Sequence, residues 1–140
     1  MATGAVDAAI FSVLSNDATL SSLAPGGVYR DIAPQNVSQP FVIVQQMDHD
    51  DNYQLGKTRS YERLSYMVKA VARSNSASGV TAAAERIETL LQNATLSVSG
   101  YALMLIERSE RIKYVEISAD NLDIRYQHCG GLYEVMVDPT

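Results

Sequence analysis

Residues 60–94 have the sequence SYERLSYMVKAVARSNSASGVTAAAERIETLLQNA, and this stretch decides the fold. Apolar and polar side chains alternate along its first part, Ser60–Arg73, as they do in a β-strand with one buried and one solvated face. The apolar series is Leu64, Tyr66, Val68, Ala70 and Ala72, and the polar series is Arg63, Ser65, Lys69 and Arg73. We therefore expect a long strand whose basic side chains share one face.

The second part of the stretch, residues 79–94, carries the pattern of an amphipathic helix. Its apolar residues recur at helical spacing and are Val80, Ala83, Ala84, Ile87, Leu90, Leu91 and Ala94. Ser74–Ser78 supplies the break before it and several hydroxyls that can cap a helix. A sheet with one apolar face needs a cover, so this helix is predicted to pack on the sheet.

The rest of the chain adds further strands and one more helix. In chain order the patterns predict a helix over 5–15 with Thr3 as its cap, a short helical turn after Asn16-Asp17, an extended piece over 28–32, a loop over 34–40, a strand over 41–47, a long polar hairpin loop over 48–59, and strands over 101–117 and 122–137. The apolar phase of the last strand shifts at Gly130-Gly131, which predicts a β-bulge. The predicted fold is α+β, a mainly antiparallel sheet covered by one long helix (about 79–94) with an N-terminal helix alongside, in a single domain over residues 1–140.

Composition and charge exclude several classes of protein. The net charge is −5, which argues against simple electrostatic wrapping of nucleic acid. Cys129 is the only cysteine, so no intrachain disulfide can form. The N-terminus shows no signal-peptide pattern, and no apolar run approaches the length of a membrane span, so no membrane partner is expected.

The acidic run Asp48-His49-Asp50-Asp51-Asn52 has the composition of a metal site but fails the calcium-loop pattern. The sixth position is Tyr53 instead of glycine, and the twelfth is Arg59 instead of glutamate. Contiguous acids on a loop seldom converge on one ion, so a solvated loop is the favoured interpretation. We expect no metal and no cofactor.

No catalytic group stands out elsewhere. His128 and Cys129 are neighbours on a predicted strand, so their side chains should point to opposite faces and not meet. Arg108 and Arg111 lie among glutamates, a mixture that favours a solvated face or a subunit contact over phosphate binding. The sequence therefore predicts a protein that is not an enzyme.

Two short motifs in the first half carry a resemblance to a known family. They are Val28-Tyr29-Arg30-Asp31-Ile32-Ala33-Pro34-Gln35 and Gln39-Pro40-Phe41-Val42-Ile43-Val44. A predicted helix precedes the motifs, and a long strand, a helix and two more strands follow them, ending in Tyr133-Glu134-Val135-Met136-Val137. In this order the segments resemble the tail completion, or tail terminator, proteins of tailed bacteriophages. The resemblance spans nearly the whole chain.

The resemblance implies a structural virion protein of the tail or neck, assembled in the host cytoplasm. Members form rings, usually hexamers, at the head-proximal end of the tail tube, where they end polymerisation and join the tail to the head. The implied partners are other copies of the chain, the tail tube protein, a head-completion, connector or neck protein, and genomic DNA that passes through the channel without sequence-specific binding. A different neck adaptor or head-completion protein, a small soluble enzyme and a cellular ligand-binding domain remain as alternatives.

The predicted interface consists of polar residues of the 48–59 loop and of basic residues on two strands. It comprises Asp48, His49, Asp50, Asp51, Asn52, Tyr53, Lys57, Arg59, Arg63, Lys69, Arg73, Arg108 and Arg111. If DNA passes through a ring, Asp48, Asp50 and Asp51 are the leading candidates for an acidic channel wall. The three bases on strand 60–73 would then lie in subunit contacts or outside.

Overall fold

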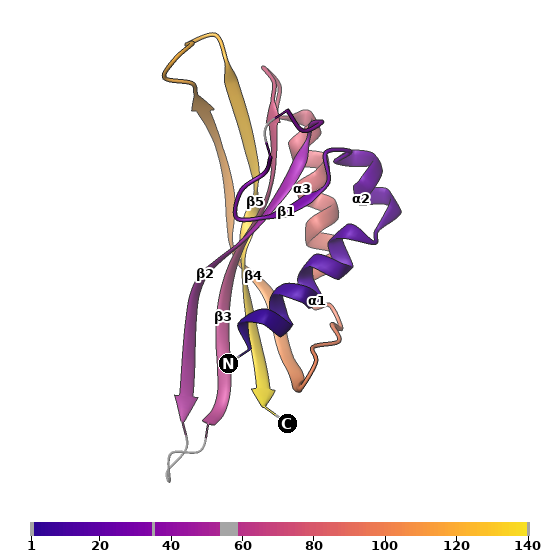
Figure 1. Ribbon diagram of the computed structural model, residues 1–140, viewed down its shortest axis with the longest axis vertical. Helices are drawn as coiled ribbons and strands as arrows, with labels where there is room; N and C mark the ends of the chain where they lie inside the picture. The colour runs from indigo at the N-terminus through magenta and orange to yellow at the C-terminus, as the bar shows by residue number, and fades with distance from the viewer. Residues whose placement is uncertain (1, 35, 54–58, 140) are drawn as a thin grey trace.

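The computed structural model of the chain describes residues 2–34, 36–53 and 59–139. Within these residues three helices and five strands follow one another (Figure 1). They are α1 (Thr3–Ser15), α2 (Ala18–Leu23), β1 (Val28–Arg30), β2 (Phe41–Tyr53), β3 (Arg59–Arg73), α3 (Ser78–Leu91), β4 (Tyr101–Ile117) and β5 (Arg125–Pro139). The predicted central strand and its helix are thus present within two or three residues of their expected ends.

The strands form one mixed sheet in the order β1-β2-β3-β5-β4. β2, β3, β5 and β4 pair antiparallel with their neighbours, and only β1 pairs parallel, with Val28–Arg30 opposite Val42–Val44. The α+β class and the mainly antiparallel pairing are therefore confirmed, with β1 as the parallel exception.

The three described helices all contribute to the cover of the sheet, whereas the prediction made the helix at 79–94 the cover and placed the N-terminal helix alongside it. α3 buries Val80, Ala83, Ile87 and Leu91, but α1 buries Val6, Ala9, Ile10 and Leu14, and α2 buries Leu20 in the same core. The reason is length: the 14 residues of α3 span about 21 Å, whereas the 15 residues of β3 span about 50 Å. One helix of this size leaves part of the apolar face to the N-terminal helices, which lie beside α3 (Figure 1).

The predicted loop over 48–59 is wrong in its extent. β2 continues to Tyr53 and pairs with β3 back to Arg59, with register irregularities after Gln46 and after Asn52. Alternation of apolar and polar residues reveals a strand only where one of its faces is buried. This segment is polar on both faces, so its sequence suggested a loop. The pairing of the two flanking strands as a hairpin was predicted correctly.

The expected bulge at Gly130-Gly131 is also absent, because β5 pairs with β3 without a break from Tyr126 to Val137. The irregularities lie instead in β4, between Leu103 and Leu105 and between Arg108 and Glu110. A Cβ at Gly130 would come within 2.1 Å of a backbone oxygen of β3. Close approach of the two backbones explains why residue 130 is a glycine. The apparent shift in the apolar pattern arises because Tyr126 and His128 lie on the opposite face of the sheet from Tyr133, Val135 and Val137.

Side-chain caps and ion pairs fix the helices in place. Asp17 caps α2 by accepting a hydrogen bond from the Leu20 amide at 2.8 Å, and Arg86 of α3 donates to both of its oxygens at 2.9 and 2.7 Å. The Arg86 guanidinium holds the pKa of Asp17 below its usual value. Thr3 is not the cap of α1, since the helix begins at Thr3 after Ala2 with no side-chain cap.

Candidate assembly surface

The sheet face opposite the helices is here called the open face, because no helix of the described chain packs on it (Figure 1). The strand register places alternate residues of four strands on it. Among them are Ile43 and Gln45 of β2, Lys69, Val71 and Arg73 of β3, Tyr126 and His128 of β5, and Tyr114 and Glu116 of β4. A sheet surface of mixed apolar and charged groups is what a protein–protein contact uses.

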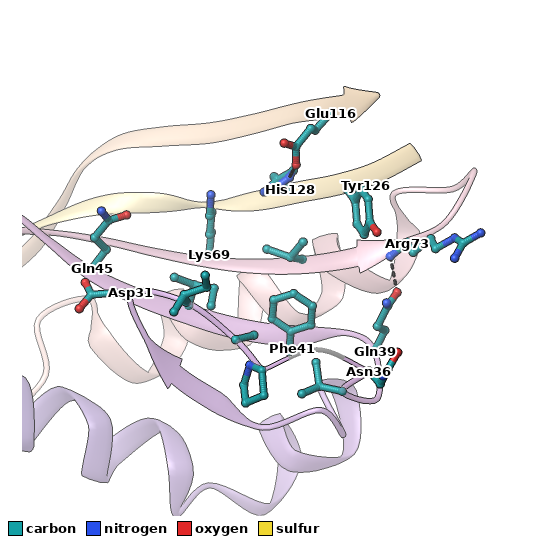
Figure 2. Close-up of a pocket in the computed structure, with 16 residues that line it drawn as sticks. Asp31, Asn36, Gln39, Phe41, Gln45, Lys69, Arg73, Glu116, Tyr126 and His128 are labelled. Carbon is teal, nitrogen blue, oxygen red and sulfur yellow. Dashed lines mark hydrogen bonds and ion pairs between the residues drawn. The ribbon is translucent and has the colours of Figure 1, made fainter. Parts of the chain in front are cut away.

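A pocket of about 510 Å³ lies where the segment between β1 and β2 meets the open face (Figure 2). Ile43 and Val71 are buried and form part of its apolar floor together with Phe41. Lys69 and Arg73 lie on its wall, and the backbone amide of Arg73 donates a hydrogen bond to Gln39. The pocket joins an apolar base to charged walls, as sites that bind a ligand or a peptide do.

His128 connects β4 and β5 beside this pocket. Its ring stacks on Tyr114 with centroids 4.3 Å apart and an interplanar angle of 9°, and its Nε2 lies 3.1 Å from Glu116 Oε1. Lys69 donates to the Tyr114 hydroxyl at 2.8 Å. Burial lowers the pKa of His128, and Lys69 acts in the same direction against the raising effect of Glu116. The neutral ring therefore donates its Nε2–H to Glu116 at pH 7 and fixes the end of β4.

Cys129 lies on the core side of β5, as the alternation of the strand predicted. It cannot meet the ring of His128, which faces the pocket side. Within the described residues no group of three or more His, Cys, Asp or Glu side chains could hold a metal ion. No described helix is long and apolar enough to cross a membrane.

Two acidic residues of β2 lie on the open face of the sheet. Asp48 and Asp50 pair with Ser65 and Arg63 on the open face, and Asp50 Oδ2 lies 3.4 Å from the Arg63 guanidinium. Asp51, Asn52, Tyr53 and Arg59 lie in the paired strands of the same hairpin, and Lys57 lies outside the described residues. Arg63 therefore lies beside Asp50 on the open face, and the role of Asp48, Asp50 and Asp51 in a channel wall stays a prediction.

His49 faces the helices and not the open face. Its Nε2 lies 2.8 Å from Oε1 of Glu62, a fully buried residue, and its Nδ1 lies 3.2 Å from the Thr3 hydroxyl of α1. The same Glu62 oxygen accepts a hydrogen bond from the Ala2 amide at 2.8 Å. His49 thus ties the start of α1 to the β2–β3 hairpin, a structural role that its sequence neighbours gave no reason to expect.

The basic residues of the predicted interface also separate. Lys69 and Arg73 share the open face with Arg63, as the strand pattern predicted. Arg108 and Arg111 belong to the helix side of β4, where their side chains lie 2.5 and 3.8 Å from Glu88 of α3. These two arginines therefore hold the helix against the edge strand.

The exposed apolar tip of the β4–β5 hairpin was missed by the sequence analysis. Val115, Ile117 and Leu122 are 50, 53 and 72% exposed, on either side of the turn at Ala119-Asp120-Asn121. The signal was present in the sequence, since three large aliphatic residues flank a turn that is too short to bury them. Their exposure gives this tip the character of a contact site.

Comparisons with known proteins agree with this picture. Residues 8–138 match the sequence profile of the family described as tail completion protein gp17. The fold is similar to that of a chain from the virion of a native gene transfer agent particle, with a TM-score of 0.73 and 20% identity over 98% of this chain and 97% of that one. A second solved structure has a TM-score of 0.58 at 14% identity, covering 100% of this chain and 96% of its own. A search of the curated proteins gave no match.

Proposed function

Because the chain belongs to the tail completion protein gp17 family, we propose that it forms a ring at the head-proximal end of a phage-type tail. The ring ends polymerisation of the tail tube and joins the tail to the head or neck. Six copies are the expected number. The partners are other copies of the chain, the tail tube protein and a connector, head-completion or neck protein.

The observation that carries this proposal is the family match over nearly the whole chain. The likeness to a chain in a gene transfer agent virion supports the same fold in a virion component. The open face and the β4–β5 tip support it further, because they leave charged and apolar groups without a cover in the isolated protomer. Ring assembly gives such surfaces a partner and protects the exposed strand edges.

Charge on the open face bears on the passage of DNA. Asp48 and Asp50 lie on this face at the β2–β3 hairpin, and Lys69 and Arg73 lie on the same face nearer the pocket. A channel wall rich in bases would hold phosphates and slow the DNA. We therefore propose that the β2–β3 hairpin, including Asp51, borders the channel or an adjoining ring, and that the Lys69–Arg73 end contacts another subunit.

The oligomeric state of the purified chain tests the ring directly. Six copies of the 15.3 kDa chain give a particle of about 92 kDa, which native mass spectrometry and negative-stain imaging distinguish from a monomer. In a phage-type particle that lacks the protein, we expect tails of uncontrolled length or tails that fail to join heads, restored by the wild-type chain. A monomer both in solution and in the particle would refute the ring.

The position of the ring in the particle tests its role. Labelling the chain and imaging assembled particles should place it between tail tube and neck. A ring found on the head side with no contact to the tail tube would instead favour a neck adaptor or head-completion protein.

A further inference from the structure

His128 lies on the open face, in the part of the sheet where β3, β5 and β4 are neighbours. In the strand register it stands between Val71 of β3 and Tyr114 of β4. Its ring stacks on that of Tyr114 with 4.3 Å between the centroids, and Glu116 reaches toward it from β4, with its Oε1 3.1 Å from the ring Nε2 (Figure 2). His128 therefore joins β5 to residues 114–116, just before β4 ends at Ile117.

The other ring nitrogen of His128, Nδ1, has no acceptor for a proton. The residue is 7% exposed, and Nδ1 is buried without a hydrogen-bond partner in the described part of the chain. In the neutral ring with its proton on Nε2, Nδ1 carries only a lone pair. In the charged ring Nδ1 also carries a proton, and an unpaired donor of a buried charged group costs more free energy than an unpaired neutral acceptor. The site therefore favours the neutral ring.

Charged groups of both signs surround the ring. The titratable and charged side chains that face it are Lys69 and Arg73 of β3, Tyr114 and Glu116 of β4, Tyr126 of β5 and Asp31 of the segment between β1 and β2, and β2 faces it with Phe41, Ile43 and Gln45. Burial lowers the pKa of His128, the hydrogen bond to Glu116 opposes this effect, and the charge of Lys69 adds to it. The Glu116 side chain is 62% exposed, so water weakens its attraction for a charged ring.

We propose that His128 is a pH switch for the end of the β4–β5 hairpin, residues 114–124. At neutral pH the ring holds β4 against β5 at this end, and in acid the protonated ring leaves its site and releases the strand. The pocket of about 510 Å³ beside the ring gives the charged ring access to water (Figure 2). The switch is a property of the single folded chain, so it stands or falls independently of the proposed ring.

The opening is local because the two ends of the hairpin are held differently. Toward the C-terminus β5 contributes Tyr133, Val135 and Val137 to the core. At the other end Val115 and Ile117 are 50 and 53% exposed, and no helix covers this part of the sheet (Figure 1). Segments with few buried apolar contacts are the ones that open without unfolding the rest of a domain.

The direction of the pH dependence follows from the lowered pKa. An open hairpin exposes His128 to water, where its pKa is about 6.5, above the value in the closed state. The stabilisation from the neutral ring is therefore complete above about pH 6.5 and is lost as the pH falls from there through the pKa of the closed state. Between these two pKa values the equilibrium constant for opening should rise by up to about tenfold for each unit of pH.

NMR on the full chain measures both the proton and the opening. The ring signals of His128 give its titration, and amide hydrogen exchange, corrected for the intrinsic effect of pH on the exchange rate, gives the protection of each residue. Between about pH 7.5 and 4.5 we expect the protection of residues 114–117 to fall as His128 titrates, while that of Val135 in the core stays constant. Constant protection of residues 114–117 through the whole titration would overturn the inference.

The variant His128→Gln separates the histidine from the acids of the chain. Its amide can still donate to Glu116 but cannot take up a proton in this range, so the protection of residues 114–117 should no longer depend on pH above the range where carboxylates titrate. The matched control is His49→Gln, which changes the second of the two histidines, on the helix side, and should retain the response. A response of wild-type size in His128→Gln would refute the switch.

Two neighbouring charges provide a test that keeps the histidine in place. Lys69→Met removes a positive charge and should move the midpoint of the opening to higher pH, whereas Glu116→Gln retains a hydrogen-bond acceptor without the charge and should move it to lower pH. The two shifts must match the shifts of the His128 ring titration in the same variants. If His128→Gln fails to fold, this pair decides, and midpoints that stay unchanged or move in the same direction would overturn the inference.

Discussion

Replacement of Ile87 gives the sharpest test of how the sheet is covered. This residue is 0% exposed on the buried face of α3, among side chains of the common core. Truncation to valine removes one methyl group and should cost about 0.5–1.5 kcal/mol of unfolding free energy, and truncation to alanine about 2–5 kcal/mol. The free energy of unfolding of a domain is about 5–15 kcal/mol in total, so Ile87→Ala should retain the fold but lose a large part of this free energy.

Urea unfolding followed by circular dichroism measures this loss. With a slope of about 2 kcal/mol per molar urea, Ile87→Ala should lower the midpoint by about 1–2.5 M with the slope unchanged. Leu90→Ala, a partly buried position on the same helix, should cost clearly less, and Glu85→Ala, an exposed position, close to nothing. Equal costs at the three positions would refute the packing of α3 on the sheet.

Ile87→Asp extends the series to an unpaired buried charge. It should unfold the domain, because no partner within the core can compensate the carboxylate. The matched change Leu90→Asp should be milder, since a partly exposed side chain can turn its charge to water. A fully stable Ile87→Asp variant would mean that α3 is not part of the core.

Four further changes test individual sites by urea unfolding. Glu62→Ala should cost about 1–3 kcal/mol, because it leaves buried hydrogen-bonding partners at the start of α1 unpaired, and a neutral result would contradict that role. The contact of Asp17 with Arg86 stabilises the folded chain above the ordinary aspartate pKa of about 3.9, and this stabilisation is lost as the pH falls through the lower pKa of the folded state. In Asp17→Asn the free energy of unfolding should therefore fall less steeply toward acid pH than in the wild type. An unchanged pH dependence would mean that Arg86 does not act on this carboxyl. Gly130→Ala should be strongly destabilising because its Cβ would meet a backbone oxygen of β3 at 2.1 Å, whereas Gly4→Ala, with open space around it, should stabilise α1 by about 0.5–1 kcal/mol.

The buried polar cluster shows why part of the molecule escaped prediction. Glu62 is separated from Ala2 by 60 residues, and no local pattern links a glutamate on a polar-looking strand to the start of a distant helix. His49 likewise stood in an acidic run whose composition favoured a solvated loop. Only the pairing of β2 with β3 turns both side chains toward α1.

The candidate assembly surface was predicted in part. The strand alternation placed Arg63, Lys69 and Arg73 on one face, which the structure confirms. It could not place Arg108 and Arg111 on the helix side, because the two irregularities in β4 change which residues share a face. The role of the full set in an interface stays a prediction.

The sequence by itself determined the elements whose side-chain period is set locally. Strand β3, helix α3 and the opposite orientations of His128 and Cys129 all follow from alternation or helical spacing, since these periods arise from backbone geometry alone. The tertiary structure decided the rest: the extension of β2 to Tyr53, the parallel addition of β1, the three-helix cover and the pocket. Each of these depends on which segments meet across the chain, and the free energy of such pairings comes from burial and hydrogen bonds between residues far apart in sequence.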